Sequence, residues 1–282
     1  MMTVEKSLEA PPLAATQGTE LVEVARKKRV NIRGLMTSLV GLGLLALGLE
    51  TASVLGPDAW GIPRSRRLVE GSFELMATDN FARAVFETVS AVVAATGLAL
   101  VAGLAVGLLT GSSRFLSITL GAPLEIVRSI PALALIPVAI LALGQGMTME
   151  VTVAAFASWW PVLFNTAYGV RGIDSMRLDA ARVMGINPIK RVWSVVIPSL
   201  TPFVLAGLRT AMPLTLIVVI AAEYLSTVQR GLGGVLIRAT STGEMEVLWC
   251  TAVVAGVLGV VMGLGLEGLQ RVAVPWAEEK KS

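Results

Sequence analysis

The chain has 282 residues, of which 54% are hydrophobic and only 15% are charged, and its mean hydropathy is +0.74. Soluble domains carry roughly 25% charged residues, so this composition excludes an ordinary soluble domain and indicates a helical membrane protein with several spans. The formal net charge of +3 does not indicate nucleic acid binding, because the basic residues flank the apolar runs.

The residue types that the chain lacks exclude several kinds of site. It has no histidine and a single cysteine, Cys250, which excludes histidine metal sites, histidine general bases and Ser-His or Cys-His pairs. No G-x-x-x-x-G-K-[ST] motif occurs, so the chain does not bind ATP through a P-loop. We therefore expect no catalytic residue, no metal site and no cofactor on this chain. Any energy that it uses must come from an ion gradient or from a partner.

The chain begins with a polar segment, residues 1–34, which we expect to be a cytoplasmic tail. Residues Leu35 to Leu55 form the first apolar run. A cleaved signal peptide is the alternative, but the run exceeds the ~7–15 residues of a signal h-region and no A-x-A-like site follows. The run is predicted to be an uncleaved first span, followed by a loop from Gly56 to Ala84.

The second span is predicted from Val85 to Thr110. Gly103, Gly107 and Gly111 follow one another at intervals of four residues, so they lie on one face of a helix. Small residues at this spacing let two helix backbones approach closely in lipid, and we expect another span to pack there.

The third apolar run, Phe115 to Leu143, is too long and too interrupted for one straight helix. It contains three prolines, each of which removes a backbone donor. We predict a short amphipathic entry and then a kinked span from about Ser129 to Leu143. Arg128 lies near the end of this span, where it either snorkels to the interface or faces the transport pathway.

Three further spans bring the predicted total to about six. They are expected at Met149–Val170, Pro198–Ala222 and Val247–Leu269, with a glycine-rich connection from Glu223 to Glu246. If the amino terminus is inside, the inner segments hold 15 and the outer segments six of the 23 Lys and Arg residues. This bias favours a multi-pass protein with both termini in the cytoplasm.

Two charged residues of the fifth span are candidates for the pathway. Arg209 lies eleven residues past Pro198, which places it roughly 16 Å into a ~30 Å apolar core. An arginine at that depth faces a water-filled pathway or an internal partner, and contact with the solute stays open. Glu223 lies at the outer end of this span, where a gating or docking role and an ordinary solvated position are both open.

A charged segment, residues 175–197, separates the fourth and fifth spans and reads "LDAARVMGINPIKRVWSVVIPSLTP" from Leu178 onward. A helix is predicted from Ser175 to Met184, with Asp174 or Ser175 as its N-cap and Gly185 in a left-handed conformation after it. Asn187 and Pro188 then start a second helix, and Pro198 and Pro202 are expected to mark a break before the span. Composition alone favours an interfacial connector over a docking element for a partner.

The spacing of residues inside this segment favours the docking element instead. The pattern D-A-A, three residues, G, nine residues, V-x-I-P resembles the E-A-A, x3, G, x9, I-x-L-P signature of permease subunits of ABC importers. The stretches "PLEIVRSIPALALIPVAILALGQG", "PFVLAGLRTAM" and "AAEYLSTVQRGLGGVL" are similar to the nitrate/sulfonate/taurine branch of that family. The resemblance covers about residues 85–276.

The resemblance implies an all-α, type I importer permease fold, with a transmembrane domain at residues 35–276 and a cytoplasmic tail at 277–282. It implies a non-enzymatic subunit in the plasma (inner) membrane of a prokaryote, with ATP bound by separate ATPase subunits. A second permease copy, in a homodimer, and an extracytoplasmic binding protein would complete the importer. The residues implied in ATPase coupling are Asp179, Ala180, Ala181, Gly185, Ile197 and Pro198.

The transported solute implied by this branch is a small anion such as a sulfonate or nitrate. Two other functions stay open from the residues alone. A secondary transporter or channel needs a buried ionisable relay or inverted repeats, and an intramembrane enzyme needs a dyad or metal ligands within the spans. The sequence offers no such pattern.

Overall fold

The computed structural model describes residues 61 and 63–274, together with 41, 43, 44, 47, 48, 50 and 51. The chain divides into two units, Met1–Pro57 and Asp58–Ser282, and the description below concerns the second. The amino-terminal tail, the predicted first span and the carboxyl-terminal tail therefore lie outside the described residues or outside this unit.

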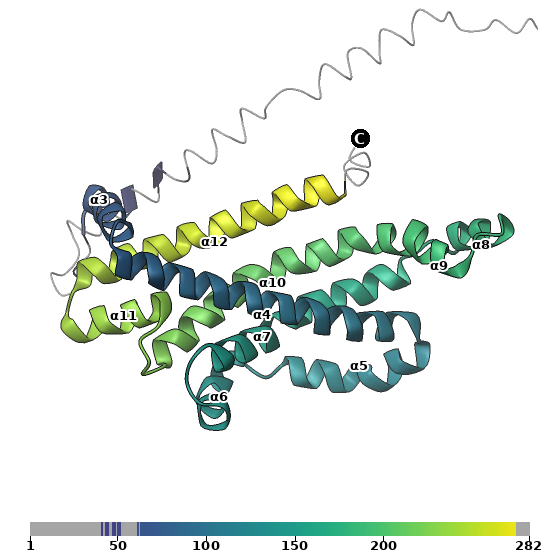
Figure 1. Cartoon of the computed structure of the whole chain (residues 1–282), viewed down its shortest axis with the longest axis horizontal. Coiled ribbons are helices and arrows are strands. Elements are labelled where there is room, and N and C mark those ends of the chain that lie inside the picture. Colours follow the sequence, from purple (N-terminus) through teal and green to yellow (C-terminus); the bar gives the residue numbers. More distant parts are fainter. Residues whose placement is uncertain are drawn as a thin grey trace, which may run out of the picture. The chain divides into compact units, whose positions relative to one another are not determined.

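Every regular element among the described residues is a helix, which agrees with the predicted all-α class. Figure 1 labels them along the chain. Their bounds are α3 Ser65–Met76, α4 Asp79–Ser112, α5 Arg114–Arg128, η2 Ala132–Leu135, α6 Ile136–Leu143, α7 Met147–Arg171, α8 Ser175–Val183, α9 Pro188–Arg191, η3 Val192–Val196, α10 Ile197–Leu225, α11 Gly231–Thr242 and α12 Met245–Ala273.

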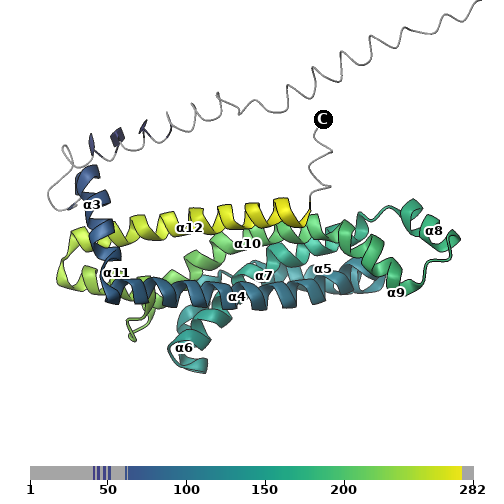
Figure 2. The same cartoon turned by 45° about the horizontal axis from the view of Figure 1, so that its top comes forward.

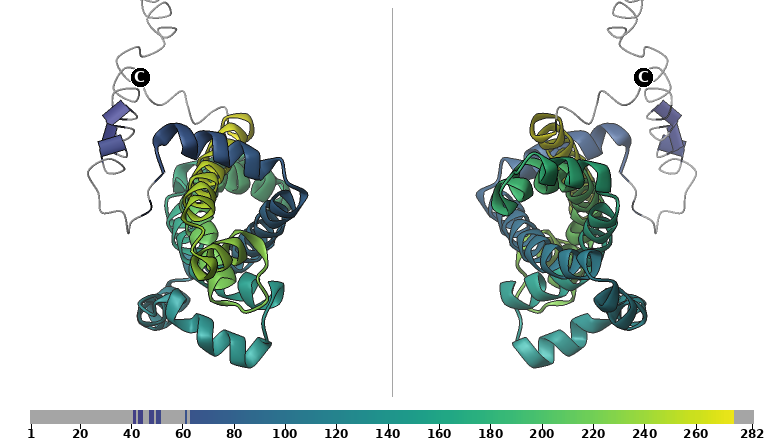
Figure 3. Two further views of the ribbon diagram at one scale, coloured as in Figure 1. Left: turned by 90° about the vertical axis from the view of Figure 1, so that its left-hand side faces the viewer. Right: turned by 90° about the vertical axis from the view of Figure 1, so that its right-hand side faces the viewer.

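Four helices of the described part are long and apolar enough to cross a membrane, and a bent pair of helices makes a fifth candidate. The four are α4, α7, the continuous helical stretch Pro188–Leu225, and α12. Each begins or ends within a few residues of the predicted span, except that the third starts earlier. In Figure 3 the long helices are seen end-on, side by side, with α5 and α6 set to one side.

The centre of this unit is the contact of α4, α7 and α10. Its fully buried side chains are mostly alanine and valine, among them Ala91, Ala95, Ala154 and Val219. Small side chains bring the backbones of neighbouring helices close together, and close packing is a main source of helix association in lipid. Large apolar side chains instead cover the outer faces, as Val260 and Leu264 do on α12, where they suit contact with lipid.

The glycine series of the second span packs as predicted. A Cβ atom on Gly103 would lie 2.8 Å from Val162 Cβ, and one on Gly107 would lie 2.7 Å from the carbonyl oxygen of Leu163. Gly111 meets α7 in the same way, at Val170. The three glycines therefore set the distance between α4 and α7.

The third apolar run differs from the prediction. The segment expected as a short entry is the full helix α5, and it is followed by a 76° bend before η2 and α6. The break itself falls where it was predicted, near Ser129, because α5 ends at Arg128 and Pro131 removes a backbone donor just after it. The pair forms a broken span or a re-entrant loop.

Two helices stand where loops were predicted. α3 follows Pro63, and α11 occupies the middle of the glycine-rich connection between Glu223 and Glu246. Both are 12 residues long, too short for the length expected of a span. α11 contains three glycines in its first four residues, which lower its intrinsic helix propensity and concealed it.

The predicted break at Pro198 and Pro202 is also wrong. The helix runs from Pro188 through Leu225, and its five residues before α10, Val192–Val196, form a wider π-type turn. A π-type turn changes the local hydrogen-bond register, which lets a helix continue past a proline that cannot donate. The second helix of the charged segment and the fifth span are thus one continuous helix, Pro188–Leu225.

Candidate coupling site and polar residues of the spans

The charged segment between the fourth and fifth spans forms an elbow, defined here as residues 172–197. Figures 1 and 2 show its helices α8 and α9 at one end of the bundle, with α3 and α11 at the opposite end. The Asp174 side chain accepts a hydrogen bond from the backbone N–H of Met176 at 2.9 Å, so α8 starts as predicted.

The turn of the elbow depends on Gly185. Its φ is +68°, the left-handed conformation that the sequence predicted. The N–H of Gly185 donates to the carbonyl of Arg182 at 2.9 Å, and the N–H of Ile186 donates to that of Ala181 at 3.0 Å. This pair of bonds is the Schellman arrangement, which needs a left-handed residue at the glycine position. Asn187 then caps α9 by accepting from the N–H of Ile189 at 3.0 Å.

An open cavity of about 1120 Å³ lies between α8 and the base of α10. Of the residues predicted for coupling, Ala180, Ala181 and Pro198 line this cavity. Asp179, Gly185 and Ile197 are exposed but lie outside its lining. The carboxylate of Asp179 pairs with Arg182 at 2.7 Å, so within the chain it is held against its own helix.

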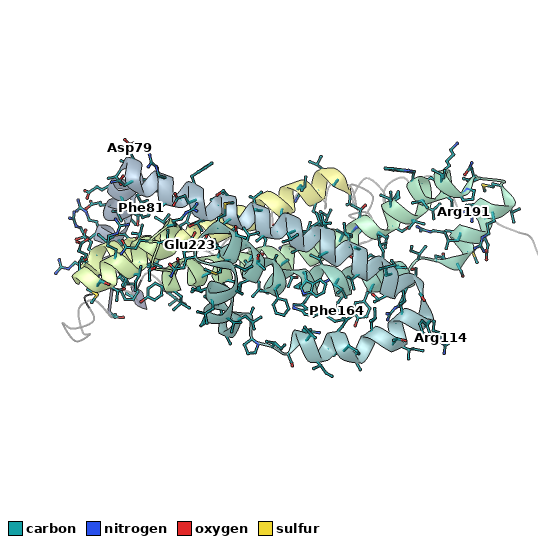
Figure 4. All side chains as sticks on the ribbon, turned by 60° about the horizontal axis from the view of Figure 1, so that its bottom comes forward. Asp79, Phe81, Arg114, Phe164, Arg191 and Glu223 are labelled. Carbon is teal, nitrogen blue, oxygen red and sulfur yellow. The ribbon has the colours of Figure 1, made fainter. Side chains whose placement is uncertain are left out.

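The outer surface of the elbow is unusually apolar. Five large apolar side chains are more than two-thirds exposed there, namely Met176, Val183, Met184, Ile189 and Trp193. A group of exposed apolar residues with charged neighbours is typical of an interaction surface. In Figure 4 Arg191, one of those neighbours, lies in this elbow.

Glu223 is not solvated, so that alternative from the sequence is wrong. It is only 1% exposed, although it lies two residues before the end of α10. Thr88 on α4 donates to both carboxylate oxygens, at 2.8 and 2.9 Å. The N–H of Gly233 donates to Glu223 Oε2 at 2.9 Å.

These contacts cap the amino-terminal end of α11, which has no cap from its own chain segment. Glu223 accepts from Gly233, Thr88 Oγ1 accepts from the N–H of Leu232 at 2.9 Å, and Glu87 Oε2 accepts from the N–H of Gly231 at 3.0 Å. Helix amino-terminal N–H groups lack partners within the helix and carry partial positive charge, so carboxylates stabilise them. We call this group the α11 cap.

The glycines of "RGLGG" make the cap possible. A Cβ atom on Gly231 would overlap the Glu223 carboxylate, and one on Gly233 would lie 2.5 Å from Glu223 Cβ. Sequence analysis missed the cap because it requires α11, which was expected to be a loop. The signal was present as a glutamate eight residues before a glycine-rich stretch.

The two arginine candidates lie apart from the α11 cap. Arg209 is 59% exposed, and its Nη2 atom is 3.9 Å from Glu267 Oε2 on α12. Arg128 pairs with Glu125 at 3.5 Å and its guanidinium lies 5.1 Å from the centre of the Phe164 ring. The structure therefore does not gather Arg128, Arg209 and Glu223 into one site within a single chain. The described residues contain no group of three metal-ligating side chains that could hold an ion.

Comparisons with known proteins agree with this architecture. Residues 78–279 match the family described as binding-protein-dependent transport system inner membrane component. The chain is 26% identical over 258 residues to the bicarbonate transport system permease protein CmpB of Synechocystis sp., covering 89% of this chain and 91% of that protein.

Two further relatives have other named solutes. The nitrate import permease protein NrtB of the same organism is 26% identical over 70% of each chain. The taurine transport system permease protein TauC of Escherichia coli is 29% identical over 63% of this chain and 64% of its own.

A solved structure has the same fold. A chain of the inward-facing MetNI methionine ABC transporter superposes with a TM-score of 0.59 at 19% identity, covering 69% of this chain and 96% of that one. The fold is therefore that of a type I importer permease. The chain belongs to the family of binding-protein-dependent transport system inner membrane components and is a multi-pass ABC transporter permease of the nitrate/sulfonate/taurine-like branch.

Proposed function

We propose that this chain forms the pathway of an ATP-driven importer for a small oxyanion and couples to a separate ATPase through its elbow. The elbow carries this proposal. It places a rigid turn and exposed apolar side chains at one end of the bundle, and its second helix continues into α10 without interruption. A displacement applied to the elbow is therefore transmitted directly to a span of the bundle core.

The solute class rests on the relatives. Bicarbonate, nitrate and taurine, the solutes in the relatives' names, each carry a small oxygen-rich anionic group. Arg209 is the candidate for attracting such an anion, because its exposed guanidinium is held only loosely by Glu267 at 3.9 Å. Arg128 and Glu223 act in our account as supports, the first at the end of α5 and the second in the α11 cap.

The remaining partners follow from the same proposal. Two copies of the chain form the pathway, an ATPase subunit binds each elbow, and a binding protein delivers the solute at the opposite end. Both termini then lie in the cytoplasm, and ATP is hydrolysed on the partner. A secondary transporter or channel is the competing function, and it would need no partner to move the solute.

The experiment that tests the proposal is co-purification of the chain with a co-expressed ATPase subunit from the same organism. Trp193→Glu places a charge on the elbow surface and should remove the ATPase from the purified complex. Phe73→Glu is the matched control, because Phe73 on α3 is 72% exposed and Trp193 is 69% exposed. Equal retention of the ATPase by both variants would contradict coupling through the elbow.

A further inference from the structure

A second cavity, of about 490 Å³, opens at the end of the bundle opposite the elbow. We call it the outer cavity. Its walls come from the end of α3, the first turns of α4, α11 and the start of α12. In Figure 4 the labels Asp79 and Phe81 mark this end of the bundle. The charged and polar residues that matter here are Arg83, Glu87, Gln229, Arg230, Arg238 and Glu244.

The guanidinium groups of the outer cavity are poorly neutralised. Arg83 and Arg238 are exposed, and neither guanidinium group forms an ion pair or a hydrogen bond with the described residues. Arg230 faces Glu87 at 3.9 Å, the outer limit for an ion pair. At the same end of the bundle, Arg66 and Arg67 form close pairs at 2.8 Å with Glu70 and Glu246. Three arginines against Glu87 and Glu244 leave the lining of the outer cavity with a net formal charge of +1.

The outer cavity is also linked to the bundle interior through Glu87. One oxygen of this carboxylate, Oε2, faces Arg230 and accepts from the N–H of Gly231 in the α11 cap. The turn leading into α11 is strained, because Gln229 has a φ of +50° and is the only described residue other than glycine with a positive φ. A strained turn that carries a loosely paired arginine suits a position where a partner exchanges contacts.

We infer that the outer cavity receives an acidic side chain of the solute-binding protein. The carboxylate of that side chain replaces Glu87 as the ion-pair partner of Arg230. This inference rests on the proposed function and deepens it by naming the docking residues. A free anion gains little from the exposed guanidinium groups of Arg83 and Arg238 at the end of the bundle, in contrast to Arg209, which lies in the middle of α10. A carboxylate on a docked protein surface adds its charge to a complete interface, where complementary charge raises the association rate and fixes the register.

The test is the affinity of the importer's solute-binding protein, from the same organism, for the reconstituted permease–ATPase complex. The double variant Arg83→Ala/Arg238→Ala should raise the Kd roughly ten-fold and flatten its dependence on salt. Arg66→Ala, outside the cavity, is the matched control and should leave the Kd within about two-fold. Retention of the ATPase by every variant shows that the complex is intact.

Glu87→Gln tests whether Arg230 exchanges its partner. For this variant we expect the Kd of the binding protein to fall, whereas it rises in the double variant. The amide oxygen still accepts from Gly231, but the charge that holds Arg230 is lost, so the Kd should fall by about two- to five-fold. Asp79→Asn removes a carboxylate at the same end but outside the cavity, and it should change the Kd less. Equal tightening by both variants would mean unspecific attraction and would overturn the exchange.

Two other results would overturn the inference while leaving the proposed function intact. In the first, the parental complex binds the protein and imports solute, and the double variant does so with unchanged Kd. In the second, bicarbonate, nitrate or taurine binds the complex without the binding protein, and the double variant abolishes that binding. The outer cavity would then hold a free solute. Failure of the parental complex to bind the protein or import any solute would instead remove the proposed function itself.

Discussion

Glu223 shows how a single carboxylate can organise one end of a membrane domain. It is buried, it lies within a span, and it accepts hydrogen bonds from two segments that are far apart in sequence, Thr88 and Gly233. Buried charge in a bilayer is costly, so such residues are found with partners that satisfy them. We interpret Glu223 as the residue that fixes the start of α11 to α4 and α10.

Removing this carboxylate should destabilise the protein. Glu223→Ala leaves the Thr88 hydroxyl and the Gly233 N–H without their acceptor, which should lower the free energy of unfolding by about 1–3 kcal/mol. Glu223→Gln keeps one acceptor oxygen and should lose less. The measurement is denaturant unfolding in detergent micelles, with exposed Glu74→Ala as the control. An Ala variant as stable as this control would refute the α11 cap.

Arg209 is the residue whose role in transport we expect to be most direct. Arg209→Leu should lower uptake roughly ten-fold, equivalent to about 1.4 kcal/mol, because the anion loses its positive partner. Arg209→Lys keeps the charge and should retain part of the uptake. Initial rates in proteoliposomes measure both, with assembly checked by co-purification of the ATPase.

Arg271→Leu is the matched control for Arg209, because Arg271 pairs with the same carboxylate, Glu267, at 3.2 Å. If Arg209 only braced α10 against α12, loss of assembly would accompany loss of uptake in both Arg209 variants. Parental uptake by Arg209→Leu would exclude a role in the pathway and a role as a brace.

At the level of elements, the elbow depends on a backbone conformation that glycine adopts without strain. Gly185→Val places a β-branched residue at φ +68° and should distort the turn, at a cost of at least about 1–2 kcal/mol. We expect the variant to enter the membrane and to retain about ten-fold less ATPase. Co-purification from equal amounts of inserted permease measures this.

A second left-handed glycine supplies the control. Gly243 has a φ of +77°, and a Cβ atom on it would meet nothing within 4 Å, as on Gly185. Gly243→Val therefore introduces the same strain at the opposite end of the bundle, after α11, and should keep the ATPase. Loss of the ATPase in both variants would indicate general instability instead of a defect in the elbow.

The elements also show which features a sequence can predict. The long spans α4, α7 and α12 were predicted to within six residues at each end, since an apolar run long enough to cross a membrane is most often a span. The caps of α8 and α9 were predicted because Asp174, Gly185 and Asn187 act within their own turns. Local chemistry was sufficient in both cases.

Features that depend on contacts distant in sequence were not predictable in this way. α11 begins with a glycine-rich stretch of low helix propensity, and it is stabilised by Glu87, Thr88 and Glu223 from other helices. The burial of Glu223 followed from that unseen helix. The continuity of α9 with α10 was not predictable either, because Pro198 indicated a break. The π-type turn before Pro198 lets the helix continue.

At the scale of the whole molecule, the two ends of the bundle have different surfaces. One end carries the apolar elbow, and the other carries the arginine-lined outer cavity and the α11 cap. Continuous helices, α10 above all, connect the two ends. A permease of this design has a place for an energy source and a place for a delivered solute, but the sequence contains no P-loop that could bind ATP.

The most direct test of this account is solute uptake into proteoliposomes with and without partners. The permease alone should move no bicarbonate, nitrate or taurine down a gradient. The permease with its ATPase and binding protein should import at least one of these solutes, or the ligand that the binding protein carries when purified, and only when ATP is supplied. Flux through the permease alone, or import that ignores ATP, would contradict the account and favour a channel or secondary transporter.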